Sequence, residues 1–106
     1  NKKYLLNDIS RFVTNKNWLI NDSFRFGGYG KVNKELIEFM NDFKLKYDIL
    51  LDPIYTSKLV YGVFSMIKNS YFKPKSKVLI IHTGGHQGIL PMNNFLKSKN
   101  LTTINI

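Results

Sequence analysis

Residues 82–85, His-Thr-Gly-Gly, are the first residues of this chain whose types and spacing could do chemistry. They follow the apolar run Val78–Ile81 and combine an imidazole, a hydroxyl and two glycines. Two glycines let the backbone turn tightly and let another group approach it closely. Ligands of open α/β sheets bind beyond the carboxyl ends of the strands. The pattern therefore predicts a small-molecule site, with an ordinary strand-to-helix turn as the alternative.

Two tyrosines add candidate site residues. Tyr55 comes just before a predicted helix, at a place where backbone N–H groups are free and anions are favoured. Tyr29 lies between Gly28 and Gly30, in a loop whose spacing matches no nucleotide-phosphate motif. A structural use of Tyr29 and a contact with a ligand both remain open.

Helical periodicity predicts the elements that must position these residues. Apolar side chains recur every three to four positions in four segments. The predicted helices are 4–13, a second helix that Asn33 caps and that ends at Tyr47, 57–69 with Thr56 or Ser57 as cap, and 89–96 with Pro91 in its first turn.

Short apolar runs between these segments predict strands. They are residues 49–51 and Val78–Ile81, with 18–20 as an edge strand or packed loop and 101–106 as a last strand or frayed tail. Helices that alternate with strands are typical of parallel pairing. We therefore expect an α/β fold, an open three-layer α/β/α sheet in a single segment that spans residues 1–106.

The charge balance allows a second function. The net charge is +9, from 16 Lys and Arg against 7 Asp and Glu, and the densest cluster is Lys73–Lys77 beside Tyr71 and Phe72. Basic residues next to aromatic rings are typical of nucleic-acid binding. The lysines are otherwise scattered along the chain, so a solvated basic surface is favoured over a nucleic-acid partner.

The composition also excludes several kinds of site. The chain has no Cys, which excludes disulfides, thiolate metal sites and a cysteine nucleophile. This fits a reducing, cytoplasmic location, and we expect no metal. No apolar run approaches the roughly 20 residues of a membrane helix, so no membrane partner is expected.

Three segments together resemble a known family. Gly27–Gly30, Leu51–Lys58 and Ile81–Gly85 resemble, in order and spacing, the C-terminal part of the pyridoxal-phosphate (PLP) enzymes of the 1-aminocyclopropane-1-carboxylate deaminase and D-cysteine desulfhydrase family. That family has the tryptophan synthase β-like fold. The resemblance covers nearly all of this chain and roughly the final third of such an enzyme, so residues 1–106 are expected to be the C-terminal portion of a larger PLP-binding domain.

The resemblance implies a role for each matching residue. Thr83 matches the residue whose hydroxyl hydrogen-bonds the pyridine nitrogen of PLP. Tyr55 matches the tyrosine that packs against the cofactor ring, and it could exchange a proton with the substrate if its pKa were depressed. Tyr29 matches a tyrosine on the substrate side. Gly84 and Gly85 would give the cofactor ring close access to the backbone.

Two positions depart from the family pattern. Thr56 stands where the deaminases carry Glu, which favours sulfide elimination from D-cysteine over deamination of 1-aminocyclopropane-1-carboxylate. His86 follows the glycine pair where the pattern has an apolar residue. A solvent-facing histidine is favoured there over a pH-dependent contact.

The resemblance also implies that essential parts lie outside this sequence. The Schiff-base lysine, a Ser–Asn pair and the phosphate-binding loop lie upstream in the family, and Lys31, Lys58 and Lys77 are not in that context. We therefore expect an enzyme whose partners are a small amino-acid substrate and the missing N-terminal part, with a homo-oligomer as the default by analogy. We expect the 106 residues alone to be inactive. The first residue is Asn, so we expect a processed product, a trimmed chain or a piece of something longer. A stand-alone protein that contacts other chains through an exposed sheet edge is the remaining alternative.

Overall fold

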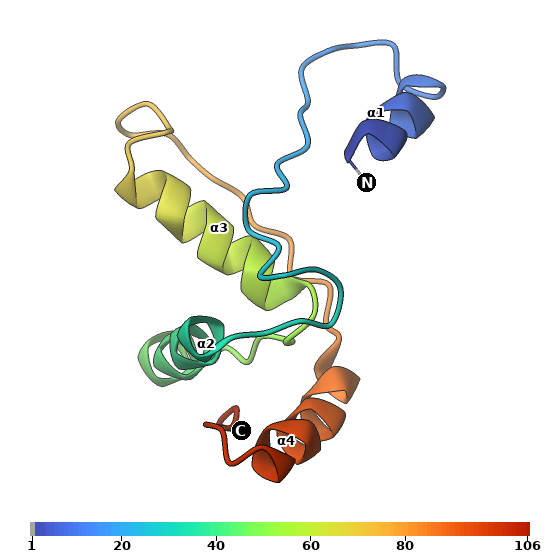
Figure 1. Cartoon of the computed structure of the whole chain (residues 1–106). Helices are drawn as coiled ribbons and strands as arrows, with labels where there is room; N and C mark the ends of the chain where they lie inside the picture. The colour runs from blue at the N-terminus through green and yellow to red at the C-terminus, as the bar shows by residue number, and fades with distance from the viewer. Residues whose placement is uncertain (1) are drawn as a thin grey trace.

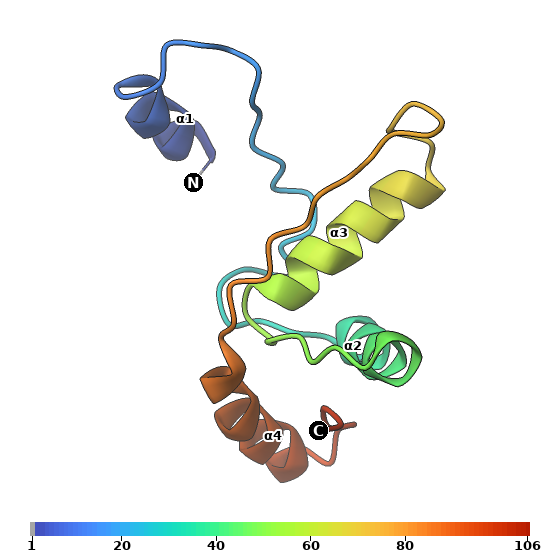
Figure 2. The same cartoon turned by 180° about the vertical axis from the view of Figure 1, so that it is seen from behind.

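The computed structural model describes residues 2–106 and consists of helices joined by extended segments. Helix α1 is Lys2–Ser10, α2 is Lys34–Tyr47, α3 is Thr56–Lys68 and α4 is Ile89–Ser98, with a short 3₁₀ helix η1, His86–Gly88, in front of α4. Helix α1 has no buried residue and lies apart from the other helices at the end of a long extended segment (Figures 1 and 2). The fold that matters for the site is therefore made by α2, α3, α4 and their connections.

The predicted α/β sheet is wrong. Residues 2–106 contain no strand, and the part of the chain that the structure describes is helical. Residues 78–81 are outside any helix, as their β-prone composition predicts, but Leu79 is 87% exposed and Ile81 66%. A strand forms only when a neighbouring segment accepts its backbone hydrogen bonds, and no segment of residues 2–106 pairs with this one.

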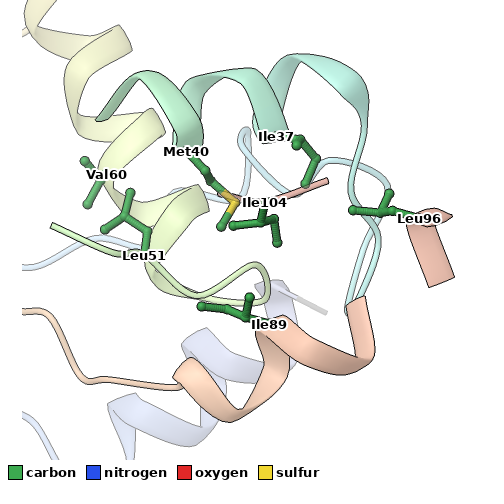
Figure 3. Close-up of a cluster of buried hydrophobic side chains, with 7 residues drawn as sticks. All are labelled: Ile37, Met40, Leu51, Val60, Ile89, Leu96 and Ile104. Carbon is green, nitrogen blue, oxygen red and sulfur yellow. The ribbon is translucent and has the colours of Figure 1, made fainter. Parts of the chain in front are cut away.

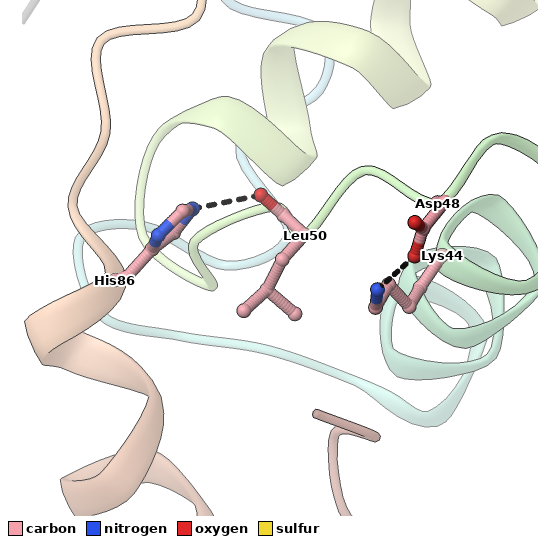
Figure 4. Close-up of polar contacts among 4 residues, drawn as sticks. All are labelled: Lys44, Asp48, Leu50 and His86. Carbon is pink, nitrogen blue, oxygen red and sulfur yellow. Dashed lines mark hydrogen bonds and ion pairs between the residues drawn. The ribbon is translucent and has the colours of Figure 1, made fainter.

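The predicted helices are confirmed to within a few residues at their ends. The side chain of Asn33 caps α2 as expected, because its Oδ1 accepts a hydrogen bond from the Leu36 backbone N–H at 2.9 Å. At the other end of α2, Asp48 adopts a left-handed conformation and pairs with Lys44 (Figure 4). Local periodicity and capping thus account for where this helix begins and ends.

The buried core lies where α2, α3 and α4 meet the segment before α3 and the C-terminal residues (Figure 3). The helix faces supply most of it, and Leu51 and Ile104 come from segments without regular structure. The core side chains are Ile37, Met40, Leu51, Val60, Ile89, Leu96 and Ile104.

Two asparagines tie the C-terminal segment to this core. Buried Asn93 donates to the Ile104 carbonyl at 2.9 Å and accepts from the Ile104 N–H at 2.8 Å. Asn41 does the same for the Thr103 carbonyl and the Asn105 N–H. The side-chain amides replace a neighbouring strand here, so residues 101–106 form neither the predicted last strand nor a frayed tail.

Candidate functional site

The N-terminus of α3 is fastened by one carboxylate. Asp52 is 1% exposed, and its Oδ1 accepts hydrogen bonds from the backbone N–H groups of Ile54 and Tyr55, each at 2.8 Å. Its Oδ2 accepts from the Thr56 N–H at 2.8 Å and from the Thr56 hydroxyl at 2.6 Å. The prediction of free N–H groups beside Tyr55 is therefore wrong, because Asp52 already supplies the anion at this helix end.

These hydrogen bonds also determine the ionisation of Asp52. Burial raises the pKa of its carboxyl group, but the hydrogen bonds from the Thr56 hydroxyl and from three backbone N–H groups outweigh burial. The net result is a pKa below the ordinary value. The predicted cap of α3 by Thr56 or Ser57 is wrong, since neither side chain caps this helix and the Thr56 hydroxyl is bound to Asp52.

The glycine turn packs directly on this carboxylate. Gly84 and Gly85 have φ values of +87° and +90°, which side chains rarely adopt. A β-carbon built on Gly85 would meet Cγ of Asp52 at 2.9 Å, whereas one built on Gly84 would meet nothing within 4 Å. Thr83 is exposed, and its hydroxyl has no hydrogen-bond partner among residues 2–106. Asp52 thus holds the start of α3 and the turn 83–85 together.

Tyr29 and Tyr55 come together as ring neighbours. Their ring centroids are 6.0 Å apart at 59°, although the residues come from different loops. Hydrogen bonding with Tyr29, then burial, then the charges of Tyr29 and Asp52 raise the pKa of Tyr55 above its ordinary value of 10.0. The depressed pKa that proton abstraction by Tyr55 would need is therefore absent from this structure. Tyr55 is protonated at neutral pH and can donate a hydrogen bond.

A cavity of about 450 Å³ opens beside these tyrosines. Its walls are the loop 21–29 and the face of α3 that carries Leu59, Gly62, Val63 and Met66. Tyr29 and Tyr55 both line it, whereas Thr83, Gly84 and Gly85 do not. The structure thus brings the two candidate tyrosines to one cavity and leaves the three turn residues on the Asp52 side of the α3 N-terminus.

Two histidines meet at a single carbonyl. Nε2 of His82 and Nε2 of His86 lie 2.9 Å and 2.8 Å from the Leu50 carbonyl oxygen (the His86 contact is drawn in Figure 4). The Gly84 N–H donates to Nδ1 of His82 at 3.0 Å, so Nε2 of His82 carries the proton that the carbonyl accepts. His86 is exposed, as expected, but it also makes this contact.

Two residues that hold the site, Asp52 and Lys58, are not among those predicted from the sequence. Asp52 has no role in the sequence-based predictions, although an Asp before Pro with Thr four positions later is a usable signal for a carboxylate that turns back onto a helix start. Lys58 donates to the backbone carbonyls of Arg25 and Gly28. A contact between a lysine and two distant carbonyls leaves no pattern in the sequence.

Comparisons with known proteins support the resemblance to the 1-aminocyclopropane-1-carboxylate deaminases over part of the chain. The chain is 31% identical over 84 residues to a 1-aminocyclopropane-1-carboxylate deaminase of Cyberlindnera saturnus, a match that covers 79% of this chain and 25% of that protein. It is 38% and 39% identical, over 65 and 66 residues, to proteins of Pyrococcus furiosus and Pyrococcus abyssi that are each named "Putative 1-aminocyclopropane-1-carboxylate deaminase". These two matches cover 61% and 62% of this chain and 19% of each relative.

The matched region is a small part of each relative. The chain spans about a quarter or less of the length of the relatives that it matches. No protein-family model matches the chain, and no solved structure matches it. None of the helices within residues 2–106 is long and apolar enough to cross a membrane. By sequence, the chain is a relative of the 1-aminocyclopropane-1-carboxylate deaminases that corresponds to one segment of these proteins.

Proposed function

We propose that this chain forms one wall of a PLP site in an enzyme that eliminates or deaminates a small amino acid. The observation that carries the proposal is the convergence at one helix start: Tyr55 leads into α3, Tyr29 contacts it, and the turn 83–85 packs on the same Asp52. Three segments that are far apart in the sequence thereby lie around the start of α3, with the two tyrosines at the cavity and the turn 83–85 against Asp52. The related deaminases support the same reading.

The residues present fit the ring of the cofactor. The Thr83 hydroxyl is free to donate a hydrogen bond, and Gly84 has open space where a side chain would stand. The Tyr55 side chain is 60% exposed and offers an aromatic face. PLP supplies an electron sink when bound, and a neutral hydroxyl at its ring nitrogen tempers that sink, which suits elimination. In this proposal the Schiff-base lysine and the phosphate-binding loop come from outside the 106 residues.

Tyr55 then acts as a hydrogen-bond donor on the substrate side. Its raised pKa keeps the phenol protonated at neutral pH. A protonated phenol can donate to a developing negative charge or hand a proton to a leaving group, whereas it cannot abstract one. Tyr29 holds the Tyr55 ring and closes one side of the cavity.

The substrate preference that we propose is D-cysteine over 1-aminocyclopropane-1-carboxylate. Thr56 stands where the resemblance predicts Glu in the deaminases, and here it is 1% exposed and bound to Asp52. Its side chain is therefore turned into the protein and offers no carboxylate to a substrate. The names of the relatives favour the other substrate, so both must be assayed.

The test uses the full polypeptide that carries this segment, with PLP added. We expect sulfide release from D-cysteine to exceed ammonia release from 1-aminocyclopropane-1-carboxylate. We expect Thr83→Ala to lower kcat by about tenfold or more, because it removes the hydrogen bond from the Thr83 hydroxyl to the ring nitrogen of the cofactor. Thr102→Ala, which removes a hydroxyl from an exposed residue in the C-terminal segment, is the matched control. Absence of turnover of both substrates, or equal kcat values for the two variants, would overturn the proposal.

A further inference from the structure

The ammonium group of Lys58 joins α3 to the loop that carries Tyr29. Its Nζ donates to the Arg25 carbonyl at 2.8 Å and to the Gly28 carbonyl at 2.8 Å. Lys58 is half-buried and has no carboxylate partner among residues 2–106. Its positive charge is therefore satisfied by two backbone dipoles of one loop.

Those two carbonyls belong to Arg25 and Gly28, which are the first residues of two consecutive turns. The Gly28 N–H donates to the Arg25 carbonyl at 3.1 Å, and the Lys31 N–H donates to the Gly28 carbonyl at 3.1 Å. One ammonium thus binds the first carbonyl of both turns, and Tyr29 is the residue that follows the shared corner at Gly28. No other side chain of residues 2–106 donates to these two carbonyls.

The loop needs such a fastening because its backbone is unfavourable by itself. Phe26, Gly27 and Gly28 follow one another with φ values of +53°, +93° and +120°, and Gly30 has +67°. Left-handed conformations are costly for Phe, and glycines lose much conformational freedom when they are held. Two backbone hydrogen bonds alone leave a surface loop of this kind mobile.

A second contact sets the distance of the loop from the helix. Gly62 lies one helical turn after Lys58, and a β-carbon built there would stand 2.8 Å from Cδ2 of Phe24. The Phe24 ring therefore rests on bare helix backbone just before the first of the two turns. The loop is held on α3 at two positions, 58 and 62, which share one face of the helix.

We propose that Lys58 is a positioning residue whose ammonium holds the two glycine turns and so places Tyr29 against Tyr55. Tyr55 is the residue before α3 and Lys58 is in its first turn, so one helix start positions both the tyrosine and the ammonium that brings its partner. This inference rests on the proposed function only in that Tyr29 and Tyr55 face the substrate. It assigns Lys58 to the loop rather than to a covalent bond with a cofactor.

The test compares Lys58→Met with Lys31→Met in the 106-residue chain. Both variants remove one positive charge, but Lys31 is an exposed residue of the same loop whose side chain makes no hydrogen bond within residues 2–106. In Lys58→Met we expect loss of the nuclear Overhauser effects between the rings of Tyr29 and Tyr55, and trypsin cleavage after Arg25 that is about tenfold faster or more. Lys31→Met retains the ring contacts and the slow cleavage.

Two further measurements separate positioning from a general loss of structure. The pKa of Tyr55, followed by the ¹³Cζ resonance, falls toward its ordinary value in Lys58→Met because Tyr29 has left, and Lys58→Arg, which can still donate to both carbonyls, restores it. Ring contacts and a Tyr55 pKa that are unchanged in Lys58→Met, or changes of the same size in Lys31→Met, would overturn the proposal.

If Lys58→Met does not fold, hydrogen exchange of the lysine ammonium groups in the unmodified chain tests the proposal instead. A Lys58 ammonium whose protons exchange more slowly with water than those of the other lysines supports the proposal, and one that exchanges as fast as they do overturns it. None of these measurements uses PLP or a substrate. A failed activity assay therefore leaves this inference standing, and a free Lys58 leaves the proposed function standing.

Discussion

The carboxylate of Asp52 lies directly against the backbone of Gly85, where a β-carbon would meet Cγ at 2.9 Å, Cβ at 3.0 Å and Oδ2 at 3.2 Å. This contact joins the turn that carries Thr83 to the start of the helix that Tyr55 precedes. The carboxylate cannot move away from Gly85 without breaking hydrogen bonds, since three backbone N–H groups and one hydroxyl donate to it.

Gly85→Ala tests this contact, and Gly84→Ala is its control. The two glycines have nearly the same φ, so alanine is strained by about 1 kcal/mol at either position. Only the Gly85 variant adds a collision with Asp52, for a total loss of about 2–4 kcal/mol in the free energy of unfolding. Urea denaturation measures both losses, and equal values for the two variants would show that the contact does not constrain the turn.

Asp52→Asn tests the carboxylate itself and has a defined dependence on pH. The folded-state pKa of Asp52 is lowered, so its stabilisation is present above the ordinary pKa of about 3.9 and is lost as pH falls through the folded-state value. We expect Asp52→Asn to lower the free energy of unfolding by about 2–4 kcal/mol at pH 7, because an amide leaves some of the buried donors unsatisfied. The difference from the unmodified chain shrinks as the carboxylate of the latter is protonated.

Asp48→Asn provides the contrast, since Asp48 is an exposed carboxylate whose pKa is lowered by its hydrogen bond with Lys44. Asparagine tolerates the left-handed conformation found there, and surface ion pairs contribute little. We expect the unfolding curve of Asp48→Asn to coincide with that of the unmodified chain at pH 7. Unfolding curves between pH 2 and pH 7, at about one-unit steps, compare the two variants, and a larger loss for Asp48→Asn would refute the assigned role of Asp52.

Helices were predictable from this sequence, and the sheet was not. The period of the apolar side chains and the cap at Asn33 are local, so α2 begins and ends where they indicate. A strand depends on a partner elsewhere, and Val78–Ile81 has none within residues 2–106, which is why its β-prone composition led to a wrong fold.

The site was predictable only in its parts. The resemblance named Tyr29, Tyr55 and the turn 83–85, but no pattern showed that the two rings touch, because their loops meet only in three dimensions. Lys58 was one of three lysines without a role. Its contacts reach carbonyls 33 and 30 residues away, and backbone carbonyls carry no residue-specific signal.

Asn93→Ala should release the C-terminal segment. Asn93 is buried and bonds both backbone groups of Ile104, a core residue, so its loss leaves a buried donor and a buried acceptor without partners. We expect a loss of about 2–4 kcal/mol. Asn94→Ala, at the exposed neighbouring position, should change the free energy of unfolding by less than about 0.5 kcal/mol. Thermal unfolding measures both losses, and a loss of the same size in the two variants would contradict the role assigned to Asn93.

His82 should occupy a single neutral tautomer. Its Nδ1 accepts from the Gly84 N–H while its Nε2 faces the Leu50 carbonyl, so the proton must be on Nε2. Long-range ¹⁵N–¹H correlation spectra of the chain at alkaline pH distinguish the two ring nitrogens. Detection of the proton on Nδ1 would mean that His82 does not hold the turn as described.

The PLP content of the protein recovered from its own cells measures whether this segment belongs to a PLP site. We expect close to one PLP per polypeptide, in a polypeptide larger than the 12.4 kDa of this sequence. Protein of 12.4 kDa, or of any mass, that is recovered folded and free of PLP would contradict it.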